Sequence, residues 1–407
     1  MKNIRQNTRH QTRQDTRQDT RQDTRQDTRQ DTRQDTTLYN DLEITDTLPT
    51  TNKFIKMGIS KFNNLDGVSC YIISILHILQ QIPCFSNYLI NNEYLDSVKN
   101  KHSNLLVHEL YKLFKTSYAN DNINITPISF KKLLGQLNSM WSEIEHQDSQ
   151  EFLIFLISKL EEELGNHILF IPGKHFSDCD LSMDSLFLKM YGLQYMKKNQ
   201  INDCSIIKQL FIGTLVSNLK CRYCKTISPN FESFITVPLC LPVRNQFDNL
   251  TLNDCLDAFT KDEILDVHNM IDCNICGFKN QSIKTILFWK TPKIIILQLK
   301  RFIVNNYNEI TSKISNNVDY PIKNLNLHDY FHPDSPYKNK SMYNLLGVNI
   351  HQSIGDNNIN AGHYISLVQN YYDNQWYIFN DSYEPELKNE TELIDNNAYL
   401  LFYYRID

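Results

Sequence analysis

Three chemical groups that lie far apart in the sequence occur in the order that a cysteine hydrolase requires. Cys70 supplies a thiol, His363 an imidazole, and the dipeptide Asn380-Asp381 an amide and a carboxylate. In a cysteine hydrolase the imidazole accepts the thiol proton and later protonates the leaving amine, and the third group fixes the tautomer of the ring. The sequence therefore predicts nucleophilic catalysis in which Cys70 attacks and His363 acts as the base.

The segment that carries Cys70 predicts a buried helix with the thiol in its first turn. Ser69 is a candidate N-cap, and apolar residues recur at helical spacing over 72–82 until Pro83 ends the pattern. The free main-chain N–H groups and the dipole at this end of a helix favour a thiolate, so we expect a pKa below the usual ~8.5. Taken separately, Cys70 also fits a small buried hydrophobic residue, and a lone histidine such as His363 is more often structural.

Two Cys-x-x-Cys pairs, Cys221/Cys224 and Cys273/Cys276, predict a structural zinc site. A two-residue spacer lets both sulfurs of a pair reach one metal ion from a tight turn, and two pairs supply the four thiolates of a closed tetrahedral site. The 48 residues between the pairs place them on the tips of separate hairpins. Unliganded cysteines in two turns and a redox dithiol are the alternatives, and the presence of two matched pairs argues against the dithiol.

Two acidic residues, Asp148 and Glu151, open another predicted helix, which ends at Gly165. Carboxylates in the first turn of a helix often serve only the helix dipole. They can also bind a basic partner, and the local sequence leaves both interpretations open.

The hydrophobic pattern divides the chain into a helical part and a β part, which predicts an α+β fold. Helical spacing of apolar residues extends from about 56 to 165, whereas alternating β-type runs begin near 206. One predicted strand begins at His363, and residues 376–382 form its hairpin partner. His363 and Asn380 are therefore expected to meet across this hairpin.

Composition and charge argue against several other classes of protein. A formal net charge of -5 and a pI near 6.2 argue against nucleic-acid binding, and no apolar run reaches the ~20 residues of a membrane helix. The polar amino terminus carries no secretory signal, which predicts a cytoplasmic or nuclear protein. Ten cysteines in such a compartment are expected to be metal ligands or reactive thiols rather than disulfides.

The amino terminus is a low-complexity repeat. Arg-Gln-Asp-Thr occurs in six consecutive copies that start at Arg13. No copy contains an apolar residue, so nothing offsets the entropy of ordering the segment. Residues 1–52 are predicted to be a disordered tail and linker, with binding to a partner as a minor alternative.

Four motifs together resemble those of the ubiquitin-specific proteases. Gly67-Val68-Ser69-Cys70-Tyr71 resembles their cysteine box, and residues 147–153 resemble their acidic helix motif. The two cysteine pairs, followed by Leu299-Lys300-Arg301-Phe302, are similar to their zinc-bearing fingers and the next strand. Gly362-His363-Tyr364, with Trp376 and Phe379-Asn380-Asp381-Ser382, is similar to their histidine box. Each motif alone is weak, whereas the ordered set is specific and covers about residues 56–404.

The resemblance implies a papain-like cysteine protease hand over residues 53–407. Its parts would be a helical thumb (about 56–165), zinc-bearing β fingers (about 206–290) and a β palm (about 291–407). The implied activity is thiol-dependent hydrolysis of the (iso)peptide bond after the C-terminal Gly-Gly of ubiquitin, with ubiquitin and ubiquitinated proteins as partners. A structural Zn²⁺ is the implied cofactor, and we expect a monomer.

The resemblance also implies roles for single residues. Cys70 would be the nucleophile, His363 the base and Asn380 the third member of the triad. Asp381 would assist the histidine or the oxyanion region. The substrate-binding residues would be Asp148 and Glu151, which face the basic tail of ubiquitin, and Tyr364 with the loop 355–361, which borders the narrow channel for Gly-Gly.

The oxyanion segment departs from the family pattern. The family places an Asn five residues before the nucleophile, where this chain has Leu65, and Asn64 lies one residue further away, as though Asp66 were inserted. A one-residue bulge would return Asn64 to this role, whereas loss of the donor would cost ~10²–10³ in rate. A second departure, Ile73 in place of the family's Asn, is expected to be a tolerated packing change.

Three other functions remain open at this point. The chain can be an inactive relative that binds ubiquitin, which the altered oxyanion segment favours and the complete triad disfavours. It can be a protease for another ubiquitin-like modifier. It can also be a zinc-stabilised scaffold that is recruited through its repeat tail.

Overall fold

The computed structural model describes residues 57–64, 66–99, 105–165, 188–192, 194–196, 205–242, 250–304, 310–314, 316–353 and 362–406. The predicted tail and linker 1–52, Leu65 and the loop 355–361 lie outside these residues, and the predictions made for them stay predictions. None of the helices in the described part of the chain has the length and apolar content that a membrane crossing requires.

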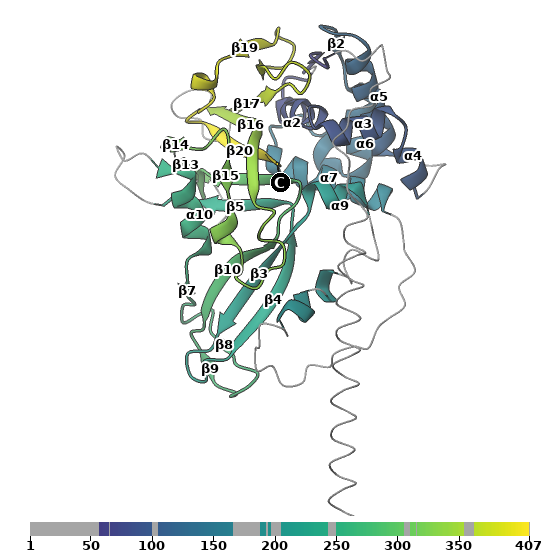
Figure 1. Cartoon of the computed structure of the whole chain (residues 1–407). Helices are drawn as coiled ribbons and strands as arrows, with labels where there is room; N and C mark the ends of the chain where they lie inside the picture. The colour runs from purple at the N-terminus through teal and green to yellow at the C-terminus, as the bar shows by residue number, and fades with distance from the viewer. Residues whose placement is uncertain are drawn as a thin grey trace, which may run out of the picture. The chain divides into compact units, whose positions relative to one another are not determined.

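The first part of the described chain folds into helices, as the spacing of apolar residues predicts (Figure 1). They are α2 (Cys70–Gln80), α3 (Pro83–Ile90), α4 (Tyr94–Ser97), α5 (Leu106–Ala119), α6 (Ile128–Leu137) and α7 (Ser149–Leu164), with the short 3-10 helix η1 (Ser139–Ser142). Two short strands, β1 (Lys61–Phe62) and β2 (Asn124–Ile125), pair in parallel beside them. Every residue of α2 is buried, so other parts of the protein pack around the whole circumference of the helix that carries Cys70.

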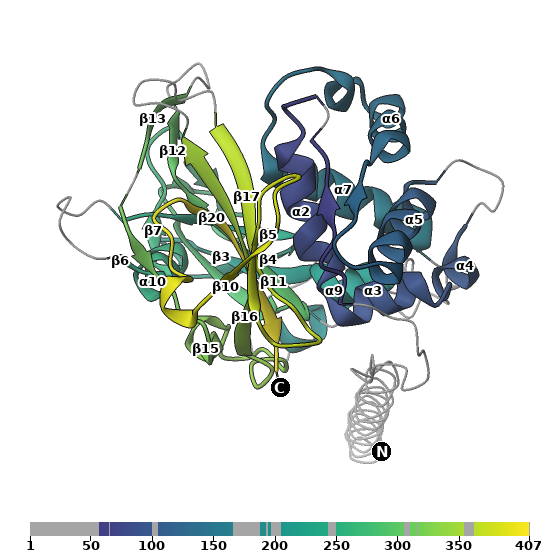
Figure 2. The same cartoon turned by 90° about the horizontal axis from the view of Figure 1, so that it is seen from above.

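The second part of the chain forms a large sheet, the palm. Its strand order is β19-β18-β17-β16-β20-β11-β5, and β15 pairs with β16. The strands are β5 (Thr236–Cys240), β11 (Ile294–Lys300), β15 (Leu325–Asn326), β16 (Met342–Ser353), β17 (Gly362–Gln369), β18 (Trp376–Phe379), β19 (Glu386–Lys388) and β20 (Ala398–Arg405). Figure 2 shows α2 between this sheet and the other helices. The thiol-bearing helix therefore packs directly on the strands that were predicted to carry the histidine and the amide.

The boundaries predicted for the fingers differ from the structure in one respect. Strand β5 lies within the predicted fingers, yet it pairs in parallel with β11 at the edge of the palm sheet. Helix α9 (Ile206–Phe211), also within the predicted fingers, contacts α7 of the thumb. The chain passes from the fingers to the palm twice, after β4 and again after β10, so a single boundary at residue 290 does not describe it.

The fingers are a four-stranded antiparallel sheet in the order β4-β3-β10-β7. Its strands are β3 (Gly213–Lys220), β4 (Ile227–Phe234), β7 (Glu263–Ile264) and β10 (Ile283–Lys290), and a small hairpin of β8 (Ile271–Asp272) and β9 (Lys279–Asn280) lies at its free end (Figure 1). The remaining elements are α10 (Leu252–Thr260), β6 (Leu250–Thr251), β12 (Phe302–Val304), β13 (Ile310–Lys313), β14 (Val318–Asp319), η2 (His328–Tyr330) and η3 (Glu390–Glu392).

A buried amide joins the thumb to the palm. Asn349 of β16 is completely buried; its Nδ2 donates to Ser74 Oγ of α2, and its Oδ1 accepts from Ser149 Oγ of α7, both over 2.8 Å. Buried polar groups are costly unless they are paired, so these two bonds favour one relative placement of α2, α7 and the sheet. These bonds thereby fix the position of Cys70 relative to the palm strands.

Candidate active site

Cys70 is the first residue of α2, where the sequence predicts it. Its side chain is buried, Sγ donates to the Val68 carbonyl over 3.9 Å, and the main-chain N–H of Tyr364, the third residue of β17, interacts with the same sulfur and favours its thiolate. The fold therefore brings the thiol within hydrogen-bond reach of the residue that follows His363, although the cysteine and histidine positions are far apart in the sequence.

The surroundings of Cys70 raise the pKa of its thiol to about 11. Burial is the main cause of this increase, and the negative charge of Asp381 raises the pKa further. Main-chain hydrogen bonds from Tyr364 and Tyr71 lower the pKa and so oppose the increase. The expectation of a pKa below ~8.5 is wrong for this structure, because the loss of water around the thiolate outweighs the favourable helix terminus. The thiol keeps its proton at neutral pH, and a base must remove it before it can attack.

His363 and Asn380 meet across the β17–β18 hairpin, as predicted. His363 Nε2 lies 2.7 Å from Asn380 Oδ1. An amide oxygen only accepts, so Nε2 carries the proton and Nδ1 carries the free lone pair. The amide thus fixes the tautomer in which Nδ1 is the basic nitrogen.

Asp381 and Asn64 form a second contact beside this pair. Asn64 Nδ2 donates to Asp381 Oδ2 over 3.0 Å, and the same carboxylate oxygen lies 3.9 Å from His363 Nε2. Asn64 Oδ1 accepts from the main-chain N–H of Ser69 over 3.0 Å. A carboxylate only accepts and an N–H only donates, so the two partners fix the orientation of the amide, and the second N–H of Nδ2 remains available to a reacting oxygen.

The backbone at Asp381 is in the left-handed region, with φ 46°. This conformation is uncommon for a residue other than glycine and persists where surrounding contacts impose it. Burial raises the pKa of Asp381, while the hydrogen bond from Asn64 and the charge of His363 lower it. The carboxylate is thus held in place between the imidazole and the amide.

The start of α2 lacks the side-chain cap that Ser69 was predicted to supply. Ser69 is the N-cap residue, but its side chain makes no capping bond; its hydroxyl donates to Asp66 Oδ2 over 2.8 Å. The main-chain N–H groups of Val68 and Ser69 donate to Asp66 Oδ1. Asp66 therefore holds the two residues that precede the helix, and no motif in the sequence indicated this contact.

The two acidic residues of α7 differ in their surroundings. Asp148 is the N-cap of α7: its Oδ1 accepts from the main-chain N–H of Gln150 over 2.6 Å, and its Oδ2 accepts from the Tyr399 hydroxyl over 2.7 Å. Glu151 is exposed. The carboxylate of Asp148 therefore serves the helix and the palm, whereas that of Glu151 faces solvent. Sequence reasoning missed Tyr399, which lies on β20 and has no local signal.

Tyr364 supports the wall of the site from within. Its side chain is only 6% exposed, and its ring packs against His351 and Tyr399 with centroid distances of 4.6 and 6.2 Å. The prediction placed Tyr364 at the border of a channel. The structure shows that its ring packs inside the palm, that its hydroxyl bonds to Ser149 of α7 and that its main chain lies beside the thiol.

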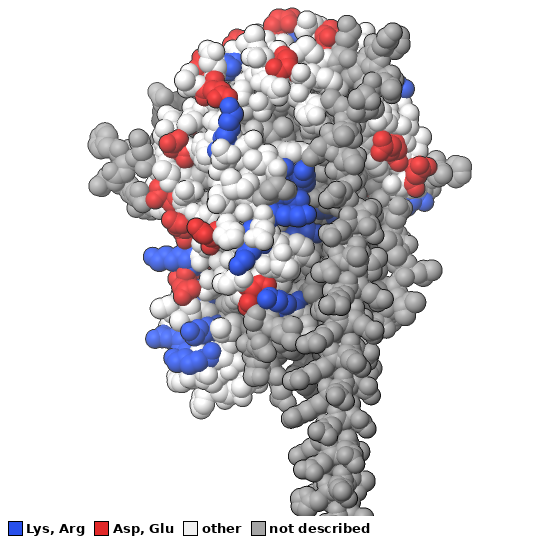
Figure 3. Space-filling model, viewed as in Figure 1, with Lys and Arg blue, Asp and Glu red and all other residues white. Residues whose placement is uncertain are grey.

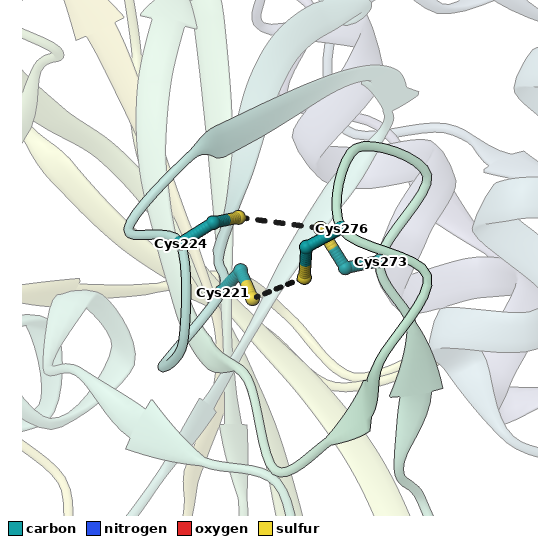
Figure 4. A group of neighbouring side chains, drawn as sticks. All are labelled: Cys221, Cys224, Cys273 and Cys276. Atoms are coloured by element: carbon teal, nitrogen blue, oxygen red, sulfur yellow. Dashed lines mark hydrogen bonds between the residues drawn. The ribbon is translucent and has the colours of Figure 1, made fainter.

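The four paired cysteines come together at the free end of the fingers (Figure 4). Their sulfur atoms all lie within 4.8 Å of one another, with 3.6 Å between Cys224 and Cys273 and 3.8 Å between Cys221 and Cys276. Four sulfurs bound to one tetrahedral Zn²⁺ at ~2.3 Å would be ~3.8 Å apart. Donor type, number and spacing therefore fit a zinc ion.

The two cysteine turns have the same backbone geometry. The N–H four residues after the first cysteine bonds back to that cysteine's carbonyl in each turn, at 3.1 Å for Lys225 and 2.8 Å for Gly277. Both of these residues have positive φ, 63° and 71°. Hydrogen bonds from the side chain and main chain of Thr226 lower the pKa of Cys224 to about 6, whereas the pKa of Cys276 is raised to about 11 by burial and by its contacts with the other three thiols.

Exposed Lys and Arg side chains lie near this cluster in the sequence. Arg222, Lys225 and Lys279 are exposed on the two turns, and Figure 3 shows Lys and Arg side chains gathered near the free end of the fingers. Four thiolates around one Zn²⁺ carry a net charge of about -2. Exposed cations close to such a site would offset part of this charge, while the exposed carboxylate of Asp272 beside Cys273 would add to it.

Comparisons of the sequence with known proteins give ubiquitin carboxyl-terminal hydrolases. The family model described as "Ubiquitin carboxyl-terminal hydrolase" matches residues 61–403. The ubiquitin carboxyl-terminal hydrolase 4 of Saccharomyces cerevisiae is 29% identical over 399 residues, which cover 90% of this chain and 41% of the relative. The human ubiquitin carboxyl-terminal hydrolase 2 is 30% identical over 350 residues, covering 85% of this chain and 55% of the relative. The chain thus spans about half or less of these relatives' length.

Solved structures show the same fold. The structure described as "the SAGA Ubp8/Sgf11/Sus1/Sgf73 DUB module bound to ubiquitin aldehyde" superposes with a TM-score of 0.66 at 24% identity, covering 91% of this chain and 74% of that chain. A yeast SAGA DUB module that carries a mutant Sgf73 gives a TM-score of 0.65. The predicted α+β fold of a protease hand is confirmed.

Proposed function

The chain belongs to the ubiquitin carboxyl-terminal hydrolase family, and we propose that it is a thiol-dependent deubiquitinase. It would hydrolyse the (iso)peptide bond after the C-terminal Gly-Gly of ubiquitin. The observation that carries this proposal is the convergence of three groups: the buried thiol of Cys70, the His363–Asn380 pair and the Asp381–Asn64 pair. An acyl transfer needs these parts, a nucleophile, an oriented base and a donor for the oxyanion.

The proposed reaction begins with proton transfer. His363 takes the proton of Cys70 at Nδ1, and the thiolate attacks the carbonyl carbon of the last ubiquitin glycine. The developing oxyanion accepts hydrogen bonds from Asn64 Nδ2 and from the free N–H groups at the start of α2. The imidazolium then protonates the leaving amine, and water hydrolyses the thioester with His363 again as the base.

Several finer roles belong to the same proposal. Glu151, which is exposed, would face the basic tail of ubiquitin, and Asp148 would hold α7 in place for that contact. Residues 53–407 would be the catalytic domain, with 1–52 as its tail. We further propose that ubiquitinated proteins are the substrates, that the chain is a cytoplasmic or nuclear monomer and that it binds no nucleic acid.

A ubiquitin probe with a C-terminal electrophile tests the activity. We expect one covalent adduct per chain, which Cys70→Ala abolishes and Cys240→Ser leaves intact, because Cys240 is an exposed free cysteine away from the site. An adduct that survives Cys70→Ala would contradict the assignment of the nucleophile. No adduct with a folded chain would indicate the inactive ubiquitin-binding relative, and an adduct only with a probe made from another ubiquitin-like modifier would indicate a protease for that modifier.

Cys221, Cys224, Cys273 and Cys276 are the residues that would hold a structural Zn²⁺. The ion would cross-link the two cysteine turns and so stabilise the free end of the finger sheet. Metal analysis of the purified chain is expected to give about one zinc per chain. Cys224→Ser should reduce the zinc content and the melting temperature, whereas the control Cys240→Ser should change neither. A metal-free preparation, or full stability after chelation, would count against the site.

A further inference from the structure

A side chain from α6 holds the loop that carries Asn64. Lys131 Nζ forms an ion pair with Asp66 and donates to Ser69 Oγ over 2.7 Å. The side chains of Lys131 and Asp66 are 23% and 21% exposed, so the pair is partly shielded from water. Shielding strengthens such a contact relative to a surface ion pair and makes either charge costly to leave alone.

The pair acts on the start of α2 through Ser69. The main-chain N–H of Ser69 is shared between Asp66 Oδ1 at 2.9 Å and Asn64 Oδ1 at 3.0 Å. Asp66 is thus bound on one side by Lys131 and on the other by the N–H group that also holds the amide of Asn64. Any rotation of the Asp66 carboxylate changes the geometry at this N–H and therefore at Asn64.

We propose that Asp66 and Lys131 are positioning residues for Asn64. The ion pair between Asp66 and Lys131 fixes the loop so that Asn64 Nδ2 stays beside Asp381, 3.0 Å from its carboxylate. This inference rests on the proposed function, since it assigns the pair to the oxyanion donor of that reaction. Neither residue touches the reacting atoms.

The proposal makes a kinetic prediction. An oxyanion donor acts in the transition state, so misplacing it lowers kcat and leaves the binding of ubiquitin unchanged. Lys131→Met should lower kcat by about tenfold, less than the ~10²–10³ expected for removing the donor with Asn64→Ala. KM for a fluorogenic ubiquitin C-terminal substrate should stay within about twofold of the wild-type value, and Lys131→Arg should restore most of the rate.

A double-mutant cycle distinguishes positioning from a general structural role. In the Asn64→Ala background, Lys131→Met should cause no further loss of kcat, because the group that it positions is absent. The matched control is Lys132→Met: Lys132 follows Lys131 on α6 and lines the same cavity of about 520 Å³, which is bordered by Asp66 and Ser69. This variant should keep the wild-type kcat, and all variants should be measured as the full chain with melting temperatures alongside.

The outcomes separate the two proposals. If the wild type turns over the substrate but Lys131→Met lowers kcat equally in both backgrounds, raises only KM or has no effect, the positioning role is refuted and the deubiquitinase assignment stands. If the wild-type chain is folded and shows neither turnover nor an adduct with the ubiquitin probe, the proposed function fails and the positioning role fails with it.

Discussion

Protonation of His77 should lower the stability of this protein in acid. His77 lies on α2, seven residues after Cys70, and is completely buried. Its ring stacks on Phe379 with a centroid distance of 4.2 Å and lies 4.8 Å from Phe62. Neither ring nitrogen has a hydrogen-bond partner among the described residues, and burial lowers the pKa of His77 to about 3.

The size of the effect follows from this pKa. In the unfolded chain the imidazole of His77 binds a proton with a pKa near 6.5. The stability that depends on a neutral His77 is therefore complete above pH 6.5 and is lost as the pH falls toward 3. Between pH 7.5 and pH 5.0 the loss through His77 amounts to about 2 kcal/mol. This loss of stability barely depends on the pKa of His77 in the folded state, because at pH 5.0 any folded-state pKa below ~4 leaves the imidazole neutral.

Urea unfolding of the full chain at the two pH values tests this prediction. His77→Phe keeps a ring between its two neighbours and cannot titrate, so it should lose about 2 kcal/mol less than the wild type on acidification. Phe62→Leu is the control: it removes packing beside His77 at both pH values and should keep the wild-type difference. If wild type and His77→Phe lose the same stability, water reaches the imidazole in the folded state and the reasoning is refuted.

The other predictions concern the thumb–palm contact, the cysteine turns and the thiol. Asn349→Leu removes two buried hydrogen bonds between thumb and palm and should lower the free energy of unfolding by about 2 kcal/mol in urea titrations; an unchanged value would mean that water replaces the amide. Lys225→Gly should raise stability by ~1 kcal/mol and Gly277→Ala should lower it by a similar amount, since both positions have positive φ; opposite signs in thermal unfolding would contradict this. Iodoacetamide should label Cys70 of the free chain about 10² times more slowly than the exposed Cys240, because burial raises the pKa of Cys70 to about 11; equal labelling by mass spectrometry would show a resting thiolate.

Much of the architecture is determined by patterns within short stretches of sequence. The apolar spacing after Cys70 predicts a buried helix, which the structure has over Cys70–Gln80 although the pattern continues to Ile82, and the spacer in each cysteine pair predicts a tight turn. The hairpin that carries His363 and Asn380 follows from two adjacent β-type runs. These predictions succeed because helix periodicity, turn geometry and hairpin pairing depend on residues close together in the chain.

Only the tertiary structure decided the surroundings of the reactive groups. Helix-terminus chemistry predicts a lowered pKa for Cys70, yet burial and Asp381 raise it, because desolvation depends on what packs against the thiol from elsewhere in the chain. The carboxylate of Asp148 is engaged by a tyrosine that lies 251 residues away. Lys131, 65 residues after Asp66, completes the loop that holds Asn64. Local sequence thus determined which groups are present and on which elements, whereas their charge states and orientations were set by neighbours that no local pattern can identify.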